Sequence, residues 1–235
     1  FGLNWFLYNL KLEHQINTSS NLSLSFFGLN ASRDALGFRT NRVDQIDVNL
    51  ERDLIKGEFS NYGFESRYLN RYSLGSKNSV FLIGMKFYNS NNDSEQGPGS
   101  SGSDANFKFY NNDFPNYFNQ SKYNYPNVNL AFFGENIFYL SEKFSITPGF
   151  RFEYIKTKSD GFYKKVNVDA AGNVILNQTI DDSETRKRNF VLLGLGASYK
   201  VARNIELYSN ISENYRSVTF ADISISNPAF SINPE

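Results

Sequence analysis

The chain has 235 residues, and its 24 Lys and Arg residues balance 24 Asp and Glu residues, so no net positive charge favours nucleic acid as a partner. It has no Cys and one His, His14, so the sequence offers neither a thiolate nor a nucleophile–base pair, and it predicts no enzyme, cofactor or metal site. Aromatic residues make up 17% of the chain, and no apolar run approaches the roughly 18 residues of a spanning helix, which favours strands.

Alternation of apolar and polar residues with a period of two predicts eight strands. Their apolar positions lie within residues 6–12, 22–26, 62–68, 81–87, 128–138, 144–154, 191–199 and 205–211. The sixth strand is the clearest, because large apolar residues alternate with polar ones from Phe144 to Tyr154. Proline removes a ladder donor, so a β-bulge or bend is expected at Pro148 beside Gly149. Several aromatic residues near strand ends are expected at a membrane interface, namely Tyr8, Tyr139, Tyr154, Tyr199 and Trp5.

The predicted connections alternate in length along the chain. Short turns are expected near residues 17–20, 74–78, 141–143 and 200–203, and long connections over about 31–57, 90–125 and 158–187. In an up-and-down sheet, all short turns then lie at one end and all long loops at the other. This asymmetry is typical of an outer-membrane β-barrel, with short periplasmic turns and long extracellular loops.

Two other classes of protein would show the same alternation of apolar and polar residues. A soluble all-β binding module would turn the apolar face inward, whereas a membrane barrel turns it toward lipid. Three structureless connections of more than about 20 residues each favour the membrane barrel over the soluble module. A passive porin-like or adhesive outer-membrane barrel would have the same fold without a plug domain.

Several segments resemble TonB-dependent receptors, and their combination is most similar to the ferric dicitrate transporter branch of Bacteroidetes-type bacteria. These segments are 32–38, 52–59, 96–107, 133–138, 144–154 and 214–220. The resemblance implies an antiparallel up-and-down transmembrane β-barrel of about 22 strands, of which about eight are present. It also implies that residues 1–235 form the central part of the barrel, with the plug domain, the TonB box and the last strand outside this segment.

The resemblance further implies energy-coupled uptake of a ferric chelate, most simply ferric citrate, across the outer membrane of a Gram-negative bacterium. The expected partners are the chelate, the receptor's own N-terminal plug domain, the TonB complex and outer-membrane lipid. Iron arrives already chelated, so no protein ligand to the metal is expected.

Four arginines in the first long connection are candidate ligand-binding residues, namely Arg33, Arg39, Arg42 and Arg52. A guanidinium group binds carboxylates through two parallel hydrogen bonds, which suits citrate. The alternative is that these arginines pair with the acids of the same segment, Asp34, Asp44, Asp47, Glu51 and Asp53.

Three charged residues share the polar faces of consecutive strands, namely Glu135, Arg151 and Glu153. They are expected to face the lumen and either contact the plug or form a structural network, since charges inside a filled barrel need partners. The aromatic residues of the connection between Asn89 and Pro126 either fold over a bound chelate as a lid or pack the loop on itself.

Overall fold

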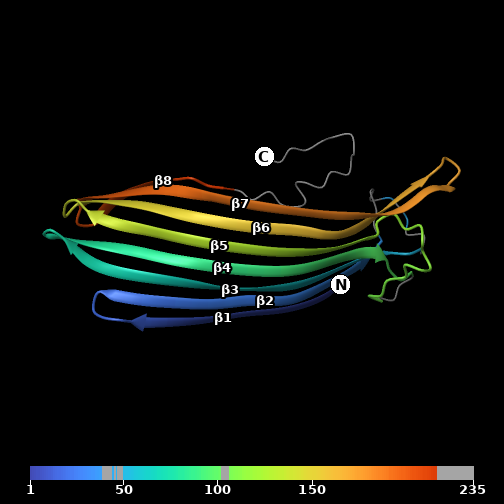
Figure 1. Cartoon of the computed structure of the whole chain (residues 1–235), viewed down its shortest axis with the longest axis horizontal. Helices are drawn as coiled ribbons and strands as arrows, with labels where there is room; N and C mark the ends of the chain where they lie inside the picture. The colour runs from blue at the N-terminus through green and yellow to red at the C-terminus, as the bar shows by residue number, and fades with distance from the viewer. Residues whose placement is uncertain (39–43, 45, 47–49, 102–105, 216–235) are drawn as a thin grey trace.

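Eight antiparallel strands in one sheet make up the fold, each hydrogen-bonded to its neighbour in sequence (Figure 1). The computed structural model describes residues 1–38, 44, 46, 50–101 and 106–215. The strands are β1 (Gly2–Gln15), β2 (Ser20–Gly37), β3 (Asp53–Leu74), β4 (Lys77–Pro98), β5 (Ser121–Tyr139), β6 (Phe144–Val168), β7 (Val174–Ala202) and β8 (Ile205–Ser212). Within this part of the chain there is no helix of a length and apolarity that could cross a membrane. The predicted all-β, up-and-down architecture is confirmed.

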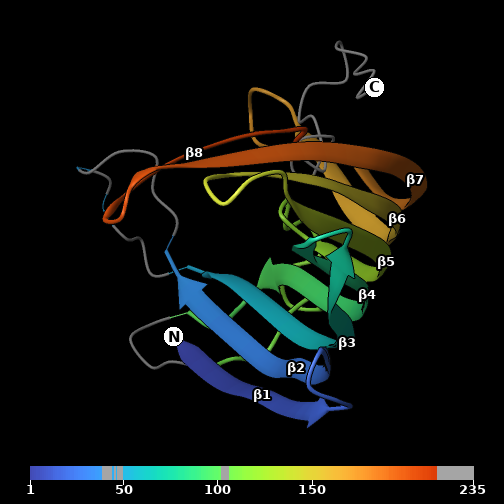
Figure 2. The same ribbon diagram turned by 90° about the vertical axis from the view of Figure 1, so that its left-hand side faces the viewer.

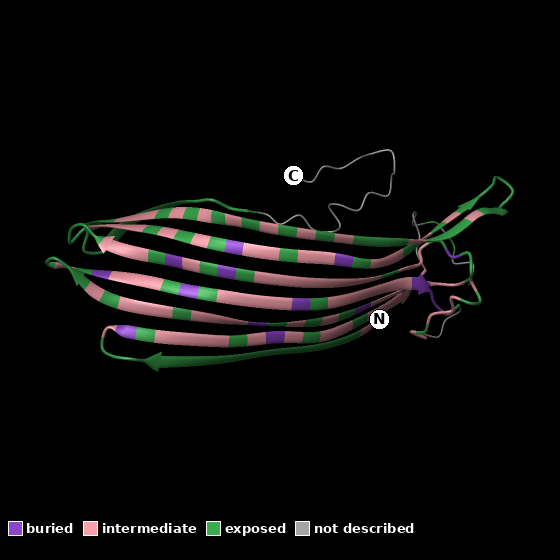
Figure 3. Ribbon diagram, viewed as in Figure 1, coloured by how far each residue is buried: buried purple, intermediate pink, exposed green. Residues whose placement is uncertain are grey.

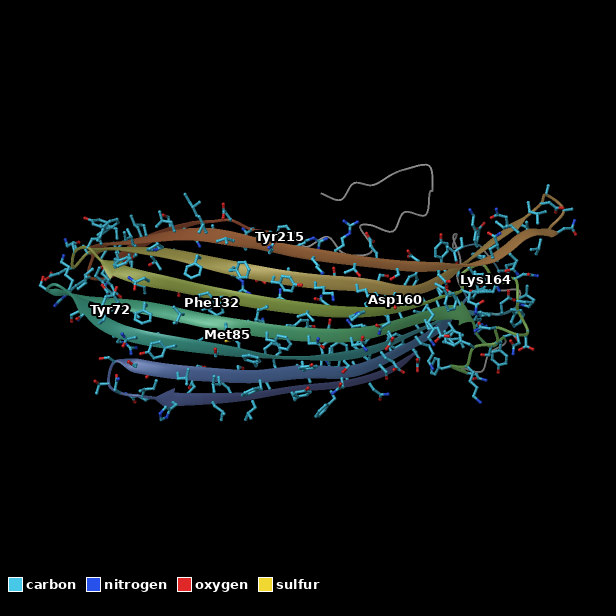
Figure 4. The ribbon with its side chains drawn as sticks, viewed as in Figure 1. Tyr72, Met85, Phe132, Asp160, Lys164 and Tyr215 are labelled. Atoms are coloured by element: carbon cyan, nitrogen blue, oxygen red, sulfur yellow. The ribbon has the colours of Figure 1, made fainter. Side chains whose placement is uncertain are left out.

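The sheet curves into an arc with β1 and β8 at its two edges (Figure 2). Directly paired residues of neighbouring strands point to the same side of the sheet, so the register sorts the side chains into two faces. One cross-strand row, for example, joins Leu24, Ser66, Met85, Phe132 and Phe152. Met85 and Phe132 lie on the side that faces the viewer in Figure 4, which is the convex side of the arc in Figure 2.

The convex face therefore carries the apolar residues that the alternation predicted. On β6 they extend from Phe144 to Tyr154. A rise of about 3.4 Å per residue makes this run about 34 Å long, and a strand tilt of about 40° reduces its height to about 26 Å. The lipid-facing band of outer-membrane barrels is about 25 Å tall. The apolar band of this sheet thus has the height of a hydrocarbon layer.

Apolar side chains of this band are exposed rather than enclosed. Phe150 and Phe152 have 41% and 38% of their surface accessible, whereas Ala131 on the concave face is fully buried. Buried residues are scattered over the described strands without forming a continuous layer (Figure 3). The sheet therefore has no dry centre of the kind that the soluble alternative requires.

Four tyrosines on the convex face lie near the ends of the apolar band, whereas Tyr68 lies within it, opposite Ile83. Tyr62 and Tyr72 are on β3, Tyr154 is on β6 and Tyr199 on β7. Two of the expected interface residues are on the opposite face, because Trp5 is paired with Ala31 and Tyr139 with Ser145. Both rings therefore lie on the concave side of the sheet. The prediction that these two residues belong to a lipid-facing girdle is wrong.

The four short turns and the longer connections lie at opposite ends of the sheet, as predicted (Figure 1). The long connections are shorter than expected, because β2 and β3 leave only residues 38–52 between them and β4 and β5 leave 99–120. The prediction of a third long connection is wrong. Residues 158–187 continue β6 and β7 as a hairpin that ends in the turn 169–173, where Gly172 has a φ of 87°.

The Asp169 carboxylate closes that turn. It accepts hydrogen bonds from the backbone N–H groups of Ala171 at 2.9 Å and Asn173 at 2.8 Å, and from the Asn173 amide at 3.0 Å. The Asn173 side-chain hydrogen bond is the largest cause of a lowered pKa for Asp169, and the backbone hydrogen bonds add to it.

Pro148 does not form the expected bulge. Pairing of β5 with β6 stops after Gly149 opposite Glu135 and resumes at Ile146 opposite Phe138 in the same register. On its other side Pro148 pairs in register with Leu195. The missing N–H donor therefore interrupts one ladder locally, and no residue is inserted.

Candidate functional site on the concave face

Two neighbouring cross-strand rows place a cluster of charged residues at the middle of the concave face. One row joins Lys11, Ser25, Glu65, Lys86, Ala131 and Glu153 from β1 to β6. The next row toward the short turns joins Glu13, Ser23, Arg67, Gly84, Phe133 and Arg151. Their alternation along each strand puts them on the side opposite the apolar band, so they would line the lumen of a closed barrel.

Ion pairs within single strands neutralise these charges except that of Lys86, whose ammonium group lies over the Phe27 ring. Arg67 Nε donates to Glu65 Oε1, and Arg151 Nε donates to Glu153 Oε1, each at 2.5 Å. Residues two apart on a strand face the same side, so each strand can satisfy its own charges without its neighbours. Glu153 is only 8% exposed and accepts a further hydrogen bond from Asn129 Nδ2 at 2.8 Å.

Aromatic rings lie over glycines of the adjacent strands on this face. A Cβ atom at Gly84 would meet Phe133 Cζ at 2.5 Å and the Ser66 carbonyl oxygen at 2.7 Å. The Arg151 guanidinium carbon is 5.3 Å from the Phe133 ring centroid, within the range of a cation–π contact. Glycine at this position thus lets Phe133 lie against the sheet, where it supports the arginine.

All three predicted lumen residues lie on the concave face. Arg151 and Glu153 form the ion pair described above, which is the structural network that the sequence allowed. Glu135 is exposed and makes no hydrogen bond or ion pair with any residue that the structure describes. With Arg67 and Arg151 it lines a hollow of about 460 Å³ that also borders Gly149. A contact of Glu135 with a plug stays a prediction.

Arg186 and Arg188 on β7 are candidate ligand-binding residues that the sequence reasoning missed. They share the concave face, opposite Thr157 and Ile155 of β6. Arg186 Nη2 donates to Glu184 Oε1 at 2.5 Å. Arg186 Nε and Arg188 Nη1 are enclosed and have no hydrogen-bond partner within the described part of the chain. Extending the alternation of β7 backward from Val191 would have placed both arginines on the polar face.

Tyrosines of β5 stand beside these arginines on the side of the longer loops, beyond the apolar band. The rings of Tyr123 and Tyr125 stack with centroids 5.7 Å apart. The Tyr123 hydroxyl donates to Asp182 Oδ2 at 3.1 Å. Burial raises the pKa of Tyr123, and the neighbouring Asp182 carboxylate raises it further. Both tyrosines are therefore neutral hydrogen-bonding groups at physiological pH.

The structure does not bring together Arg33 and Arg52, the two predicted loop arginines that it describes. Arg33 is exposed on β2, where it is paired with Gly57. Arg52 directly precedes β3 and is therefore five residues from Gly57, or roughly 17 Å along an extended chain. The Arg52 carbonyl accepts a hydrogen bond from Gly99 N at 2.7 Å. Arg39 and Arg42 lie outside the described residues.

The loop 99–120 packs onto the strand ends through a buried carboxylate. Asp53 is 8% exposed, and its two oxygens each lie 3.0 Å from the amide nitrogen of Gln96. The Tyr117 hydroxyl donates to Asp53 Oδ1 at 2.8 Å. The β6–β7 hairpin braces the same loop, because Asn177 Nδ2 donates to Asn116 Oδ1 at 2.7 Å.

The described ranges hold no group of three or more His, Asp or Glu side chains that could bind a metal ion. The concave face offers guanidinium, hydroxyl and amide groups instead. Such groups bind a carboxylate-bearing solute through hydrogen bonds and leave a metal inside the solute untouched.

Comparisons with known proteins place this geometry in a family. The family described as TonB dependent receptor-like, beta-barrel matches residues 2–235. No curated protein sequence matches the chain.

Similar solved structures include the unliganded ferric citrate transporter FecA, with 15% identity, a TM-score of 0.68 and coverage of 93% of this chain and 28% of that one. The ferric yersiniabactin uptake receptor FyuA from Yersinia pestis has 14% identity and a TM-score of 0.60, covering 88% of this chain and 28% of that one. The open form of the ferric-catecholate import receptor Fiu from E. coli K12 has 14% identity and a TM-score of 0.62, covering 89% and 35%.

At these identities the likeness concerns the fold, and the chain spans only about a third or less of each of these proteins. The match of a single family over nearly every residue, together with an up-and-down sheet whose two faces are sorted by polarity, leads to one conclusion. The chain belongs to the TonB-dependent receptor-like β-barrel family.

Proposed function

We propose that this chain forms the central barrel wall of an outer-membrane receptor that imports a ferric chelate by energy-coupled transport, with ferric citrate as the preferred substrate. The family supports the mode of transport. The three solved structures named above are described as transporters or receptors for ferric citrate, ferric yersiniabactin and ferric catecholates, which supports an iron chelate as cargo. Membership of the ferric dicitrate branch, as in Bacteroidetes-type bacteria, is part of the proposal.

The observation that carries the choice of an anionic chelate is the pair of arginines on β7. Arg67 and Arg151 on the concave face each have a carboxylate partner two residues away, whereas Arg188 has none among the described residues and Arg186, paired with Glu184, keeps an unused donor. An enclosed guanidinium donor without a partner is costly, and a bound carboxylate would satisfy it. Citrate supplies several carboxylates to such a surface.

The other groups take supporting roles in this proposal. Arg33, Arg39, Arg42 and Arg52 would meet the chelate first, on the side of the long loops. Glu135 would contact a plug domain through the hollow that it shares with Arg67 and Arg151. The plug and the TonB complex are the partners that would open the path through the barrel.

The test uses the full-length receptor and the double variant Arg186→Gln/Arg188→Gln. A hydrogen bond to a charged group contributes about 1.5–3 kcal/mol, so losing even one should weaken binding of ferric citrate by about tenfold or more. Binding and uptake are measured with radiolabelled iron as ferric citrate and as an uncharged ferric hydroxamate. The control is Arg203→Gln, an exposed arginine in the turn before β8.

We expect the double variant to lose ferric citrate affinity while the control keeps it. Unchanged citrate affinity would refute the assignment of these arginines. Uptake that continues after the proton-motive force is collapsed would instead favour a passive porin-like barrel and refute energy-coupled import.

A further inference from the structure

The convex face carries a pair of lysines just beyond the apolar band. Lys156 on β6 is paired directly with Lys187 on β7, and both side chains are exposed. Like charges directly opposite each other on neighbouring strands destabilise a sheet. Neither lysine makes an ion pair or hydrogen bond with any residue in the described ranges. Their mutual repulsion is therefore not relieved by the described part of the protein.

Other lysines on the same face do have carboxylate partners. Lys56 Nζ is 3.6 Å from Asp34, Lys122 Nζ is 3.1 Å from Glu95, and Lys158 Nζ is 3.0 Å from Asp160. The acid nearest to the lysine pair along its own face, Asp160, is thus already engaged by Lys158. On β5 the residue opposite Lys156 is Val128, which has no charge. The pair Lys156–Lys187 thus consists of two directly opposed cations with no carboxylate partner among the described residues.

The position of the pair relative to the apolar band defines the depth of its charges. Tyr154 ends the apolar run of β6, and Lys156 is the next residue on that face, about 7 Å further along the strand. On β7 the apolar run ends at Val191. Lys187 is the second residue beyond it on the same face, toward the long loops. A lysine side chain can extend along apolar surface and place its ammonium group at the edge of the hydrocarbon. Both ammonium groups therefore reach the level of lipid headgroups.

We propose that Lys156 and Lys187 form a binding site for the phosphate groups of a lipid in the outer leaflet, on the side of the long loops. A phosphate carries the negative charge that two facing ammonium groups require, and lysine is a common phosphate ligand. Lys158, in the next row, adds a third cation whose charge is shared with Asp160. The site faces lipid and is separated by the sheet from the concave face, so it does not depend on the chelate that the receptor transports.

The experiment measures binding of phosphorylated lipid A to the full-length receptor in neutral detergent, by native mass spectrometry. An ammonium group near an anionic lipid surface contributes about 1 kcal/mol, so Lys156→Gln/Lys187→Gln should weaken binding by about thirtyfold. Lipid A without phosphate should bind wild type and variant equally. The charge-conserving variant Lys156→Arg/Lys187→Arg should keep most of the affinity.

A matched control removes the same charge at the opposite end of the sheet. Lys143 and Lys200 are both exposed beside the short turns, and Lys143→Gln/Lys200→Gln should leave the affinity unchanged. Equal loss in this control would show that only net charge matters and would overturn the proposal. Unchanged binding in the Lys156→Gln/Lys187→Gln variant would overturn it as well. Uptake of the chelate serves as a separate readout of folding in each variant.

Discussion

A charge placed in the middle of the apolar band should destabilise the folded barrel, and the cost should depend on depth. Met85 on β4 lies on the convex face between Phe81 and Phe87, near the centre of the band on that strand. Asn89 lies four residues further along the same face, or about 14 Å along the strand and about 10 Å closer to the headgroups after tilting. We therefore compare Met85→Arg with Asn89→Arg.

Arginine facing lipid costs about 2–4 kcal/mol at the midplane and about 0–1 kcal/mol near the interface. Met85→Arg should thus lower the folding equilibrium constant by about 30-fold to 900-fold, whereas Asn89→Arg should change it by less than about fivefold. The measurement is urea-dependent folding of the full-length receptor into phospholipid vesicles.

A water-facing convex surface would give a different result. Substitutions on such a surface usually change stability by less than about 0.5 kcal/mol at any position. Equal and small effects of Met85→Arg and Asn89→Arg would therefore refute the assignment of the apolar band to lipid.

Three further predictions concern the concave face, the loop and the hairpin turn. Gly84→Ala should lower the free energy of unfolding by about 1–3 kcal/mol in the same folding assay, because its Cβ would meet Phe133 and a backbone oxygen. Gly37→Ala, which has open space around its Cβ, should lower it by less than about 1 kcal/mol. Tyr117→Phe should speed proteolytic cleavage within loop 99–120 by about tenfold, because the buried Asp53 carboxylate loses a donor, and an unchanged cleavage rate would contradict that role. The Asp169 turn should loosen in acid. The pKa of Asp169 is lowered in the folded state, so its contribution to stability is complete above the ordinary pKa of 3.8. That contribution disappears as the pH falls through the lower pKa of the folded state. Hydrogen exchange of the Ala171 and Asn173 amides, corrected for intrinsic rates, should therefore lose protection only at strongly acidic pH, and loss of protection near pH 6 would disagree with this sign.

The parts of the sheet with one apolar face could be predicted from the sequence, and the parts that are largely polar on both faces could not. From Phe144 to Tyr154 one face must be apolar, so the alternation marks the strand. Beyond Tyr154 both faces of β6 and β7 are polar, so the pattern disappears although the hydrogen-bonded ladder continues to Val168. This is why residues 158–187 resemble a loop in sequence and why Arg186 and Arg188 were missed.

The candidate site shows the same division. Glu135, Arg151 and Glu153 were found because they lie on the polar faces of two strands that alternate clearly. The Asp53–Tyr117 contact joins residues 64 apart in the chain, and no periodicity in sequence reports such a contact. The unmatched pair Lys156–Lys187 likewise depends on cross-strand register, which the sequence alone did not fix.

Consecutive strands of this sheet are always neighbours, and the two register shifts lie outside the apolar band, at Asn167/Val168 and at Lys200/Ala202. Each pair of strands joined by a short turn is therefore an interchangeable unit that enters and leaves the membrane on the same side. Insertion or removal of one such unit during evolution would leave the direction of every other strand unchanged. Loss of a single strand would instead reverse the direction of all strands that follow it. Barrels of this design can therefore change circumference in steps of two strands.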